Sequence, residues 1–280
     1  MAHFIYNGKS YEAGRAVIGP DSRALRYGDG LFETFKSSNG QLLFAADHFD
    51  RLWNGLHLMQ FNVPALLTPE RLEHEIGELL KKNRHTGLAR IRLTLFRGDG
   101  GLYDVMNHQP GYLVQTWALP ENAGQWNSNG LVMGIHTDAR KCRDVLSNLK
   151  HNNFLPYVLA ALQAKKEKWN DAAVLNDAGR VCDSSIANIF IVKNGKVSTV
   201  SLEEGCIAGV MRKNIIRLLA DHDIPVYESA ITVDELMDAD EVFVTNSILN
   251  ARWVQQVAGK TYTSHFIQKI YSEILSTILK

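Results

Sequence analysis

The chain has 280 residues, 45% of them hydrophobic, and its 30 Lys and Arg residues balance its 30 Asp and Glu residues. This composition can fill the core of one large or two medium domains, and the even charge argues against a nucleic-acid or membrane-surface partner. Three cysteines without C-x-x-C spacing, no signal peptide and no apolar run of about 18 residues favour a cytoplasmic protein with no membrane segment and a small-molecule partner.

The first part of the chain predicts an α+β domain over residues 1–119. Asn-Gly pairs mark tight hairpin turns, and Thr68 is suited to cap a helix that begins with Pro69. The expected elements are strands within 3–11 and 31–44, each bent at an Asn-Gly turn, helices over about 45–61 and from Pro69, and strands at 88–96 and 111–119.

Residues 120–130 are rich in turn formers and have no apolar periodicity, which predicts an interdomain linker. A second domain, of α/β or α+β type, is expected over 131–280. Its expected elements are strands at 131–136, 171–176, 187–195, 196–200 and 241–245, and helices after Lys150, from Gly209 and at the C-terminus.

Lys150 is the first candidate for chemistry, because it precedes a segment with helical apolar spacing. The predicted buried stripe of that helix is Phe154, Leu155, Val158, Leu159 and Leu162. The macrodipole disfavours a cation at a helix start, but in an apolar pocket the lysine pKa falls and exposes the free amine that a Schiff base needs. From this segment alone, a solvated lysine remains the commoner alternative.

A possible anion site lies in the segment "GCIAGVMRKNIIRLLA". Gly205 and Gly209 flank a short loop that runs into a helix, so backbone N–H groups at the helix start are unobstructed and suit a phosphate. Such helix starts are also common in proteins that bind nothing. The signal is therefore moderate.

Three further segments carry polar groups with ordinary alternatives. His48 and Arg51 lie three residues apart on a predicted helix, where arginine offers a fork for phosphate, but a solvated helix face also explains them. Asp183 precedes small hydroxyl residues that turn chemistry mostly explains. The polar "TNSILN" tip is either a loop or a set of phosphate donors. No H-E-x-x-H pair is present, so no metal site is expected.

Together and in order, six segments resemble the class IV aminotransferases, a family of pyridoxal-phosphate enzymes. They are "YGDGLFETF", "HFDRL", "LKHNN", "GRVCDSSIANIF", "GVMR" and "DEVFVTNSI". The family includes branched-chain and D-amino-acid aminotransferases and 4-amino-4-deoxychorismate lyase. The resemblance implies an α+β, two-domain fold of type IV, like that of D-amino-acid aminotransferase, with pyridoxal 5′-phosphate between the domains and usually a homodimer.

The resemblance also implies roles for individual residues. Lys150 would form the Schiff base and then move protons as the catalytic base. Asp183 stands where the family has a glutamate facing the pyridine nitrogen, and aspartate keeps the charge but is one methylene shorter. The other implied cofactor-binding residues are Arg51, Asn188, Val210, Met211, Asn246 and Ser247, and the implied substrate-binding residues are Phe32, Thr34 and Arg97.

Features of several subfamilies are mixed in this chain. Thr34 and "LKHNN" resemble the lyase, whereas "GGLYDV" lacks an arginine usual in that subfamily. Leu155 stands where branched-chain enzymes usually carry a tyrosine, and Phe32 replaces a tyrosine of the D-amino-acid enzymes.

We predict an amino-acid aminotransferase of branched-chain or D-amino-acid type that acts on amino acids and 2-oxo acids. The alternative is an aminodeoxychorismate lyase that releases pyruvate and 4-aminobenzoate. A non-catalytic pyridoxal-phosphate-binding module is the third hypothesis, since Asp183 departs from the family pattern.

Overall fold

The computed structural model describes residues 2–103 and 107–276, and the chain divides into two compact units. The N-terminal unit comprises Met1–Ala123 and Leu149–Asn153, and the C-terminal unit comprises Gly124–Asn148 and Phe154–Lys280. The first division falls inside the expected linker, 120–130. The segment around Lys150 differs from expectation, because it belongs to the N-terminal unit rather than to the domain predicted over 131–280.

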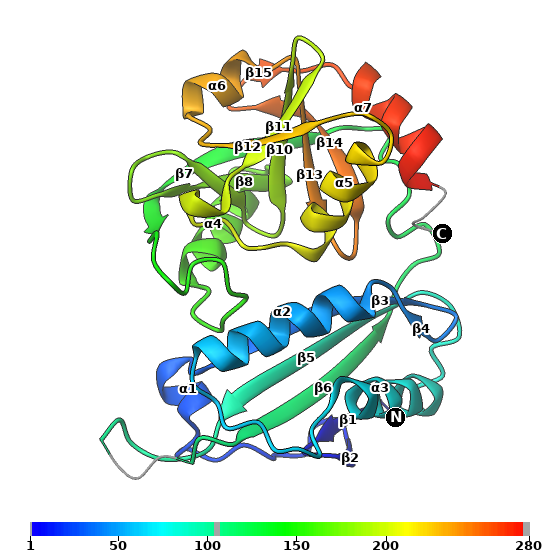
Figure 1. The fold of residues 1–280 in the computed structure, drawn as a ribbon, viewed down its shortest axis with the longest axis vertical. Coiled ribbons are helices and arrows are strands. Elements are labelled where there is room, and N and C mark those ends of the chain that lie inside the picture. Colours follow the sequence, from blue (N-terminus) through cyan, green and yellow to red (C-terminus); the bar gives the residue numbers. More distant parts are fainter. Residues whose placement is uncertain (1, 104–106, 277–280) are drawn as a thin grey trace. The chain divides into compact units, whose positions relative to one another are not determined.

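The N-terminal unit is built on an antiparallel six-stranded sheet with the strand order β2-β1-β6-β5-β3-β4 (Figure 1). Its elements are β1 His3–Tyr6, β2 Lys9–Glu12, α1 Arg23–Tyr27, β3 Gly30–Ser38, β4 Gln41–Leu42, α2 Ala45–Leu58, α3 Pro69–Lys82, β5 Ala89–Arg97 and β6 Pro110–Ala118. The two Asn-Gly hairpins are confirmed, with positive φ at Asn7, Gly8, Asn39 and Gly40. Thr68 caps α3, as predicted, by accepting a hydrogen bond from the Arg71 amide.

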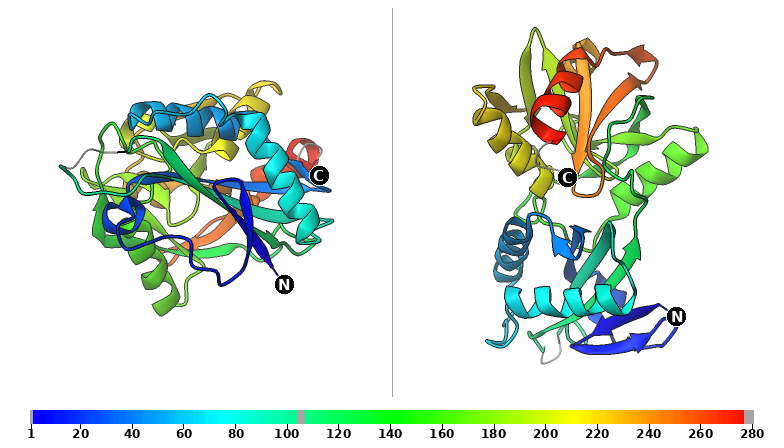
Figure 2. Two further views of the ribbon diagram at one scale, coloured as in Figure 1. Left: turned by 90° about the horizontal axis from the view of Figure 1, so that it is seen from below. Right: turned by 90° about the vertical axis from the view of Figure 1, so that its right-hand side faces the viewer.

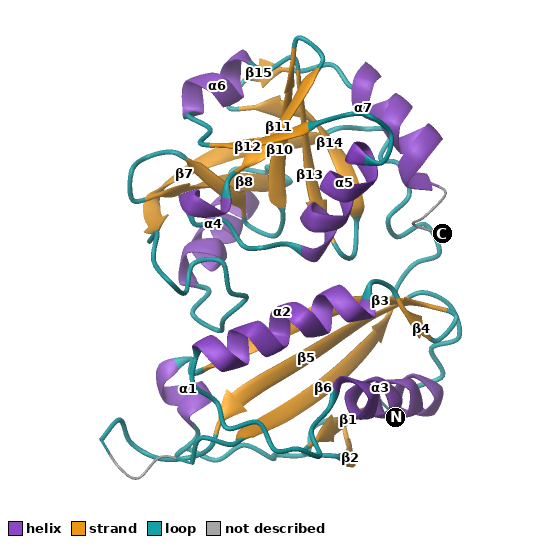
Figure 3. Cartoon of the chain, in the orientation of Figure 1, coloured by secondary structure: helices purple, strands orange, loops and turns teal. Residues whose placement is uncertain are grey.

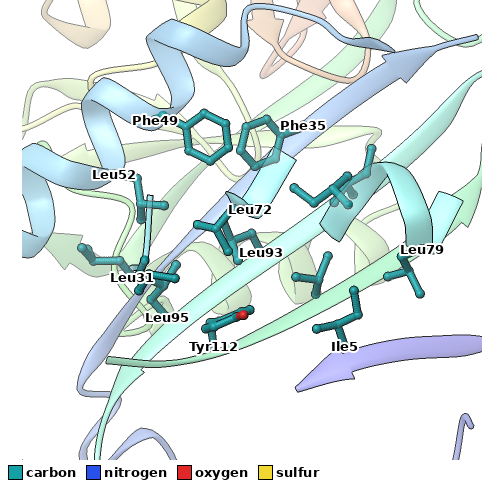
Figure 4. Close-up of a cluster of buried hydrophobic side chains, with 14 of the residues drawn as sticks. Ile5, Leu31, Phe35, Phe49, Leu52, Leu72, Leu79, Leu93, Leu95 and Tyr112 are labelled. Atoms are coloured by element: carbon teal, nitrogen blue, oxygen red, sulfur yellow. The ribbon is translucent and has the colours of Figure 1, made fainter. Parts of the chain in front are cut away.

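The core of this unit lies between the sheet and helices α2 and α3. Leu31 and Phe35 of β3 point to the helix side, where Phe35 packs on Phe49 with ring centroids 5.3 Å apart (Figure 4). Leu72 of α3 is fully buried in the same cluster. Because side chains alternate along a strand, the residues between Leu31 and Phe35 with even numbers face the other side of the sheet.

That other side carries Phe32, Thr34 and Lys36. The segment around Lys150 pairs with the start of β3, the strand to which these three residues belong. The Phe32 amide donates to the Lys150 carbonyl at 2.8 Å, and the Asn152 amide donates to the Gly30 carbonyl at 2.9 Å. Leu31 and His151 form an antiparallel bridge. Residues 149–153 therefore extend the sheet at the start of β3, which is why they group with the N-terminal unit.

The C-terminal unit contains a nine-stranded mixed sheet, seen with its helices in Figures 2 and 3. Its elements are β7 Leu131–Lys141, α4 Leu155–Lys166, β8 Asp171–Asn176, β9 Val181–Ser184, β10 Asn188–Lys193, β11 Lys196–Val200, η1 Leu202–Glu204, α5 Val210–Ala220, β12 Val226–Ser229, α6 Val233–Asp238, β13 Glu241–Asn246, β14 Asn250–Val257, β15 Lys260–Thr261, α7 His265–Ile270 and η2 Tyr271–Leu275. Strand β9 contacts β10 and β11 as well as its partner β8, so the sheet curls. Helix α4 packs on β7 and β8, and α5 packs on β12 and β13.

Helix α4 corrects two expectations. It begins at Leu155, so Lys150 lies five residues before it rather than at its mouth. The predicted buried stripe is also wrong: Tyr157, Ala160 and Ala164 face the sheet, whereas Leu155 and Leu162 are 71% and 58% exposed. The helix is apolar around most of its circumference, so periodicity did not choose a face, and its close contact with the sheet admits alanine more readily than leucine.

Several elements of this unit were not predicted, namely β9, β12, α6, β14 and β15. Strand β9 was interpreted as turn chemistry because it contains Asp183 and Ser184. All four of its residues are buried, and their polar groups find partners inside the unit. Among the described residues, none of the helices has the length and apolar character needed to cross a membrane.

Candidate active site

Lys150 lies beside an aromatic ring that a second cation also contacts, on the face of the N-terminal sheet opposite the core formed with α2 and α3. Its Nζ is 4.7 Å from the centroid of the Phe32 ring, and the Arg92 guanidinium carbon is 3.7 Å from the same centroid. The Lys150 amine and the Arg92 guanidinium therefore lie against the same ring. Thr34 stands directly opposite Arg92 across β3 and β5. The structure thus brings Lys150 together with Phe32, one of the predicted substrate residues, while Thr34, another, lies two residues farther along β3 on the same face.

This side of the sheet is strongly basic. Lys36 and Arg90 lie opposite each other next to the pair Thr34 and Arg92, and burial lowers the pKa of Lys36 to about 8. Within residues 2–103 and 107–276, Arg92 forms no ion pair with a carboxylate; its Nε donates to Thr94. A guanidinium without a carboxylate partner in the described part of the chain suits a carboxylate ligand.

Arg51 is held by the buried carboxylate of Glu33, which lies in β3 on the side that faces the helices. Its Nε lies 2.7 Å from Glu33 Oε1, its Nη2 lies 2.5 Å from Glu33 Oε2, and His48 Nδ1 is 2.7 Å from Glu33 Oε2. Glu33 is 1% exposed and His48 fully buried, so a solvated helix face does not describe this region. The glutamate holds the Arg51 fork from one side.

The ionisation of this cluster follows from its burial. Burial opposes the charge on Glu33, but Arg51 and the His48 contact outweigh it and lower the pKa of Glu33 to about 2. Burial also lowers the pKa of His48, so its ring is neutral near pH 7. An ionised carboxylate only accepts hydrogen bonds, and His48 Nδ1 must therefore carry the proton.

Arg97, the third predicted substrate residue, has a different place in the structure. Its Nε donates to Asp29 Oδ2 at 3.0 Å, and its two terminal nitrogens donate to the Met59 and Gln60 carbonyls at 2.5 and 3.2 Å. The side chain is 8% exposed. The guanidinium is thus used to bind the end of α2 to β5, and it is Arg92 that offers a fork near Lys150. Since both residues stand in a basic strand, the sequence alone did not separate them.

Asp183 lies at the centre of a buried polar cluster in the C-terminal unit. Its Oδ2 accepts hydrogen bonds from the Tyr157 hydroxyl at 2.7 Å and the Ile207 amide at 3.1 Å, and lies 3.4 Å from Lys141 Nζ. Its Oδ1 accepts from the Asn188 amide at 2.8 Å. The carboxylate is 2% exposed, and burial raises its pKa while Lys141 opposes that rise.

The start of α5 is packed directly against Asn188. The Asn188 side chain donates to the Ile207 carbonyl at 2.8 Å as well as to Asp183, and a Cβ placed on Gly209 would lie 1.9 Å from Asn188 Oδ1. The Val210 and Met211 side chains are buried, so what these residues can offer a ligand is their backbone N–H groups. Position 209 therefore requires glycine, because a residue with a Cβ could not approach Asn188 this closely.

We expect Gly209→Ala to destabilise the protein by about 1–3 kcal/mol, because the added methyl group overlaps the Asn188 amide and must push it or the helix start away. Urea unfolding would measure the change. Gly77→Ala is the matched control, since Gly77 lies within α3 with no atom near its would-be Cβ, and alanine there should be neutral or stabilising. Equal stability of the two variants would contradict the close packing at Gly209.

The turn after β13 holds the remaining predicted cofactor residues. Asn246 Oδ1 accepts hydrogen bonds from the Ile248 and Leu249 amides at 3.0 and 2.8 Å, so this side chain closes its own turn. Ser247 follows within that turn and is half-buried. Asn246 therefore fixes the backbone from which Ser247 projects.

Four residues of these clusters were not singled out from the sequence: Glu33, Arg92, Lys141 and Tyr157. The position of Glu33 inside the apolar stretch "LFETF" was a usable signal. A carboxylate in a buried strand needs a partner of opposite charge, because burying it alone costs too much free energy. Lys141 stands in the basic run "ARKCR", which resembles a solvated loop. Nothing in the local pattern distinguished it.

Comparison with known proteins identifies the family. The family model described as Amino-transferase class IV matches residues 30–257. An aminodeoxychorismate lyase of Vibrio harveyi is 30% identical over 239 residues, which cover 85% of this chain and 86% of the relative. A putative branched-chain-amino-acid aminotransferase of Methanocaldococcus jannaschii is 29% identical over 271 residues, covering 96% and 92% of the two chains.

A solved structure shares the fold. The branched-chain aminotransferase of the archaeon Thermoproteus uzoniensis, determined with norvaline, superimposes with a TM-score of 0.87 at 24% identity and covers 99% of this chain and 95% of its own. The two-domain type IV fold expected from the resemblance is thus confirmed. Class IV aminotransferases use pyridoxal phosphate. The match over residues 30–257 shows that this chain belongs to the class IV aminotransferase family.

Proposed function

We propose that the protein is a pyridoxal-phosphate-dependent amino-acid aminotransferase in which Lys150 carries the cofactor as a Schiff base. The observation that carries this proposal is the position of the Lys150 amine, against Phe32 and next to the Arg92 guanidinium, within the part of the chain that the family model matches. A lysine amine of this kind is the nucleophile that forms a Schiff base with an aldehyde.

The residues present suit three parts of the cofactor, namely the aldehyde that Lys150 would bind, the ring nitrogen and the phosphate. A buried carboxylate, Asp183, is the group expected to face a ring nitrogen, and it already accepts four hydrogen-bonding or ionic contacts that hold it in place. Arg51, oriented by Glu33, would bind the phosphate together with the Val210 and Met211 amides and the Asn246–Ser247 turn. When bound, the cofactor supplies an electron sink for the carbanion formed at the substrate α-carbon.

The side chains around Lys150 then have distinct tasks. The Lys150 amine would take the proton from the substrate α-carbon and return it to the cofactor side. Arg92, with Thr34 beside it, would bind a substrate carboxylate through its planar fork, and Phe32 would shield the amine from water. The nearby cations Lys36 and Arg90 make this side of the sheet attractive to amino acids and 2-oxo acids with more than one carboxylate.

The lyase remains the second candidate, and the relative from Vibrio harveyi favours it. Aminodeoxychorismate also carries carboxylates that Arg92 could bind, and both reactions need a lysine base. A transaminase returns the proton to the cofactor, whereas the lyase expels pyruvate as the ring becomes aromatic. A module that binds the cofactor without turnover is the third candidate.

A single-turnover experiment separates the three. We expect at least one member of a panel of L- and D-amino acids to convert the bound aldehyde to the amine form, followed by visible absorbance. No conversion, but pyruvate release from aminodeoxychorismate, would establish the lyase instead. If both assays fail although borohydride fixes the cofactor to Lys150, the binding module is correct; without that adduct the whole proposal is wrong.

We further propose, from the family resemblance, that the chain works as a homodimer in the cytoplasm. Its three cysteines are free, with Cys182 and Cys206 buried, which suits a reducing compartment.

A further inference from the structure

Lys141 is a lysine buried by an irregularity in its own strand. In β7, His136 pairs with Val174 of β8 and Lys141 with Asn176, so four residues of β7 lie opposite only one of β8. The Ala139 amide donates to His136 Nε2 at 3.2 Å inside this irregular stretch. The chain thus returns to the sheet at Lys141, whose side chain is 7% exposed although its neighbours Arg140 and Cys142 are not buried.

The buried amine is directed at one oxygen of one carboxylate. Lys141 Nζ lies 3.4 Å from Asp183 Oδ2 and 5.2 Å from the centroid of the Tyr157 ring, and the Tyr157 hydroxyl donates to the same oxygen. The Ile207 amide is a third donor to Oδ2, whereas Oδ1 accepts from Asn188 alone in the described part of the chain. The donors therefore gather on Oδ2 of a carboxylate that is only 2% exposed, and among the described residues Oδ1 has a single donor, the Asn188 amide.

We infer that Lys141 and Tyr157 are positioning residues that keep Asp183 ionised and oriented, so that its charge can serve the ring nitrogen of the cofactor. This inference rests on the proposed function for the role of Asp183. The Tyr157 hydroxyl, the Ile207 amide and, more weakly, the Cys182 thiol hold Oδ2 in place. The charge of Lys141 replaces the stabilisation that water gives an exposed carboxylate.

The other titratable groups that face Asp183 cannot replace Lys141. Burial raises the pKa of Tyr157 well above its ordinary value, so its phenol is neutral and donates a hydrogen bond. The Cys182 and Cys206 thiols also face the carboxylate; burial raises the pKa of both, that of Cys206 to about 12, so they stay neutral. Among the described residues, Lys141 is the cation in direct contact with Asp183. Removing it should therefore raise the pKa of Asp183.

The first test uses the full chain without cofactor, with carbon-13 at the aspartate carboxyl groups and NMR detection. Asp183→Asn identifies the Asp183 signal. We expect Lys141→Met to raise the midpoint of Asp183 protonation by about one pH unit or more, Tyr157→Phe to raise it less, and Lys141→Arg to restore it. Lys193→Met is the matched control, since Lys193 also contacts two aspartates but on the surface, and it should leave the Asp183 midpoint unchanged.

The second readout is cofactor retention. After dialysis at a series of pH values, Lys141→Met should lose pyridoxal phosphate at a higher pH than the wild type, by the same shift as in the NMR titration. An unchanged Asp183 midpoint in a folded Lys141→Met protein overturns the inference. If that variant does not fold, an unchanged midpoint in Tyr157→Phe overturns it. If Lys141→Met shows the expected rise of the Asp183 midpoint while the wild type forms no borohydride adduct at Lys150, that result contradicts the proposed function and not the role of Lys141.

Discussion

Lys150→Ala is expected to lose the covalent cofactor and to lower the rate of amino-group transfer by roughly 10²- to 10⁴-fold, because in the proposed function this one side chain both attaches the cofactor and moves the proton. Borohydride treatment followed by peptide mass analysis should find the reduced adduct on the peptide containing Lys150 in the wild type and none in the variant. Added methylamine should restore part of the rate, since a free amine can take over proton transfer.

The matched control is Lys166→Ala, which removes an exposed lysine from the end of α4. It should keep both the adduct and the rate. An adduct on another lysine in the wild type, or an unchanged rate in Lys150→Ala, would show that the catalytic amine lies elsewhere. Circular dichroism of each variant would establish that the fold is retained, so that a lost rate reports on chemistry.

Glu33→Gln is expected to lower the free energy of unfolding near pH 7 by about 3–5 kcal/mol, because the change leaves the Arg51 charge without its buried partner. It should also weaken binding of the cofactor phosphate, since Glu33 orients the Arg51 fork. Urea unfolding and the dissociation constant of pyridoxal phosphate would measure the two effects. Glu78→Gln, at an exposed pair with Lys81, should change neither.

The pH dependence gives a separate check on Glu33. Its pKa is about 2 in the folded chain against an ordinary value of 4.5, so the ionised carboxylate contributes roughly 3 kcal/mol of stability above pH 4.5. This contribution is lost as the pH falls from 4.5 toward 2. The stability of Glu33→Gln should lack that part of the acid decline. A wild-type curve that is flat over this range would contradict the buried ion pair.

The elements that the sequence predicted well are those with local signals. Asn7-Gly8 and Asn39-Gly40 set the turns of two hairpins, and Thr68 with Pro69 sets the start of α3, because these residues act through their own backbone and near neighbours. Strands β5 and β6 alternate clearly because one face is buried and the other is not. The roles that the motif positions imply for individual site residues stay predictions.

The parts that were missed depend on partners far away in the chain. The motif order assigned Asp183 a place in the implied site but did not reveal its buried surroundings, since its donors come from β7, α4 and the loop before α5. The face of α4 was wrong because leucine and alanine are both apolar, and the distance to the sheet, rather than hydrophobicity, decides which of them fits. Arg97 and Arg92 lie on opposite sides of β5 and therefore have different partners, and the sequence alone did not show which arginine had buried acceptors.

The pairing of residues 149–153 with β3 has a consequence for how this protein can be made and dissected. The polypeptide passes from one unit to the other after Ala123, after Asn148 and again after Asn153, so no single cut releases an intact half. A fragment ending at residue 123 would lack both the segment 149–153 that pairs with β3 and Lys150, the proposed cofactor lysine. During synthesis on the ribosome, the N-terminal unit can therefore be completed only after the 30 residues that follow Ala123 have been translated, and its last segment arrives after the first segment of the C-terminal unit.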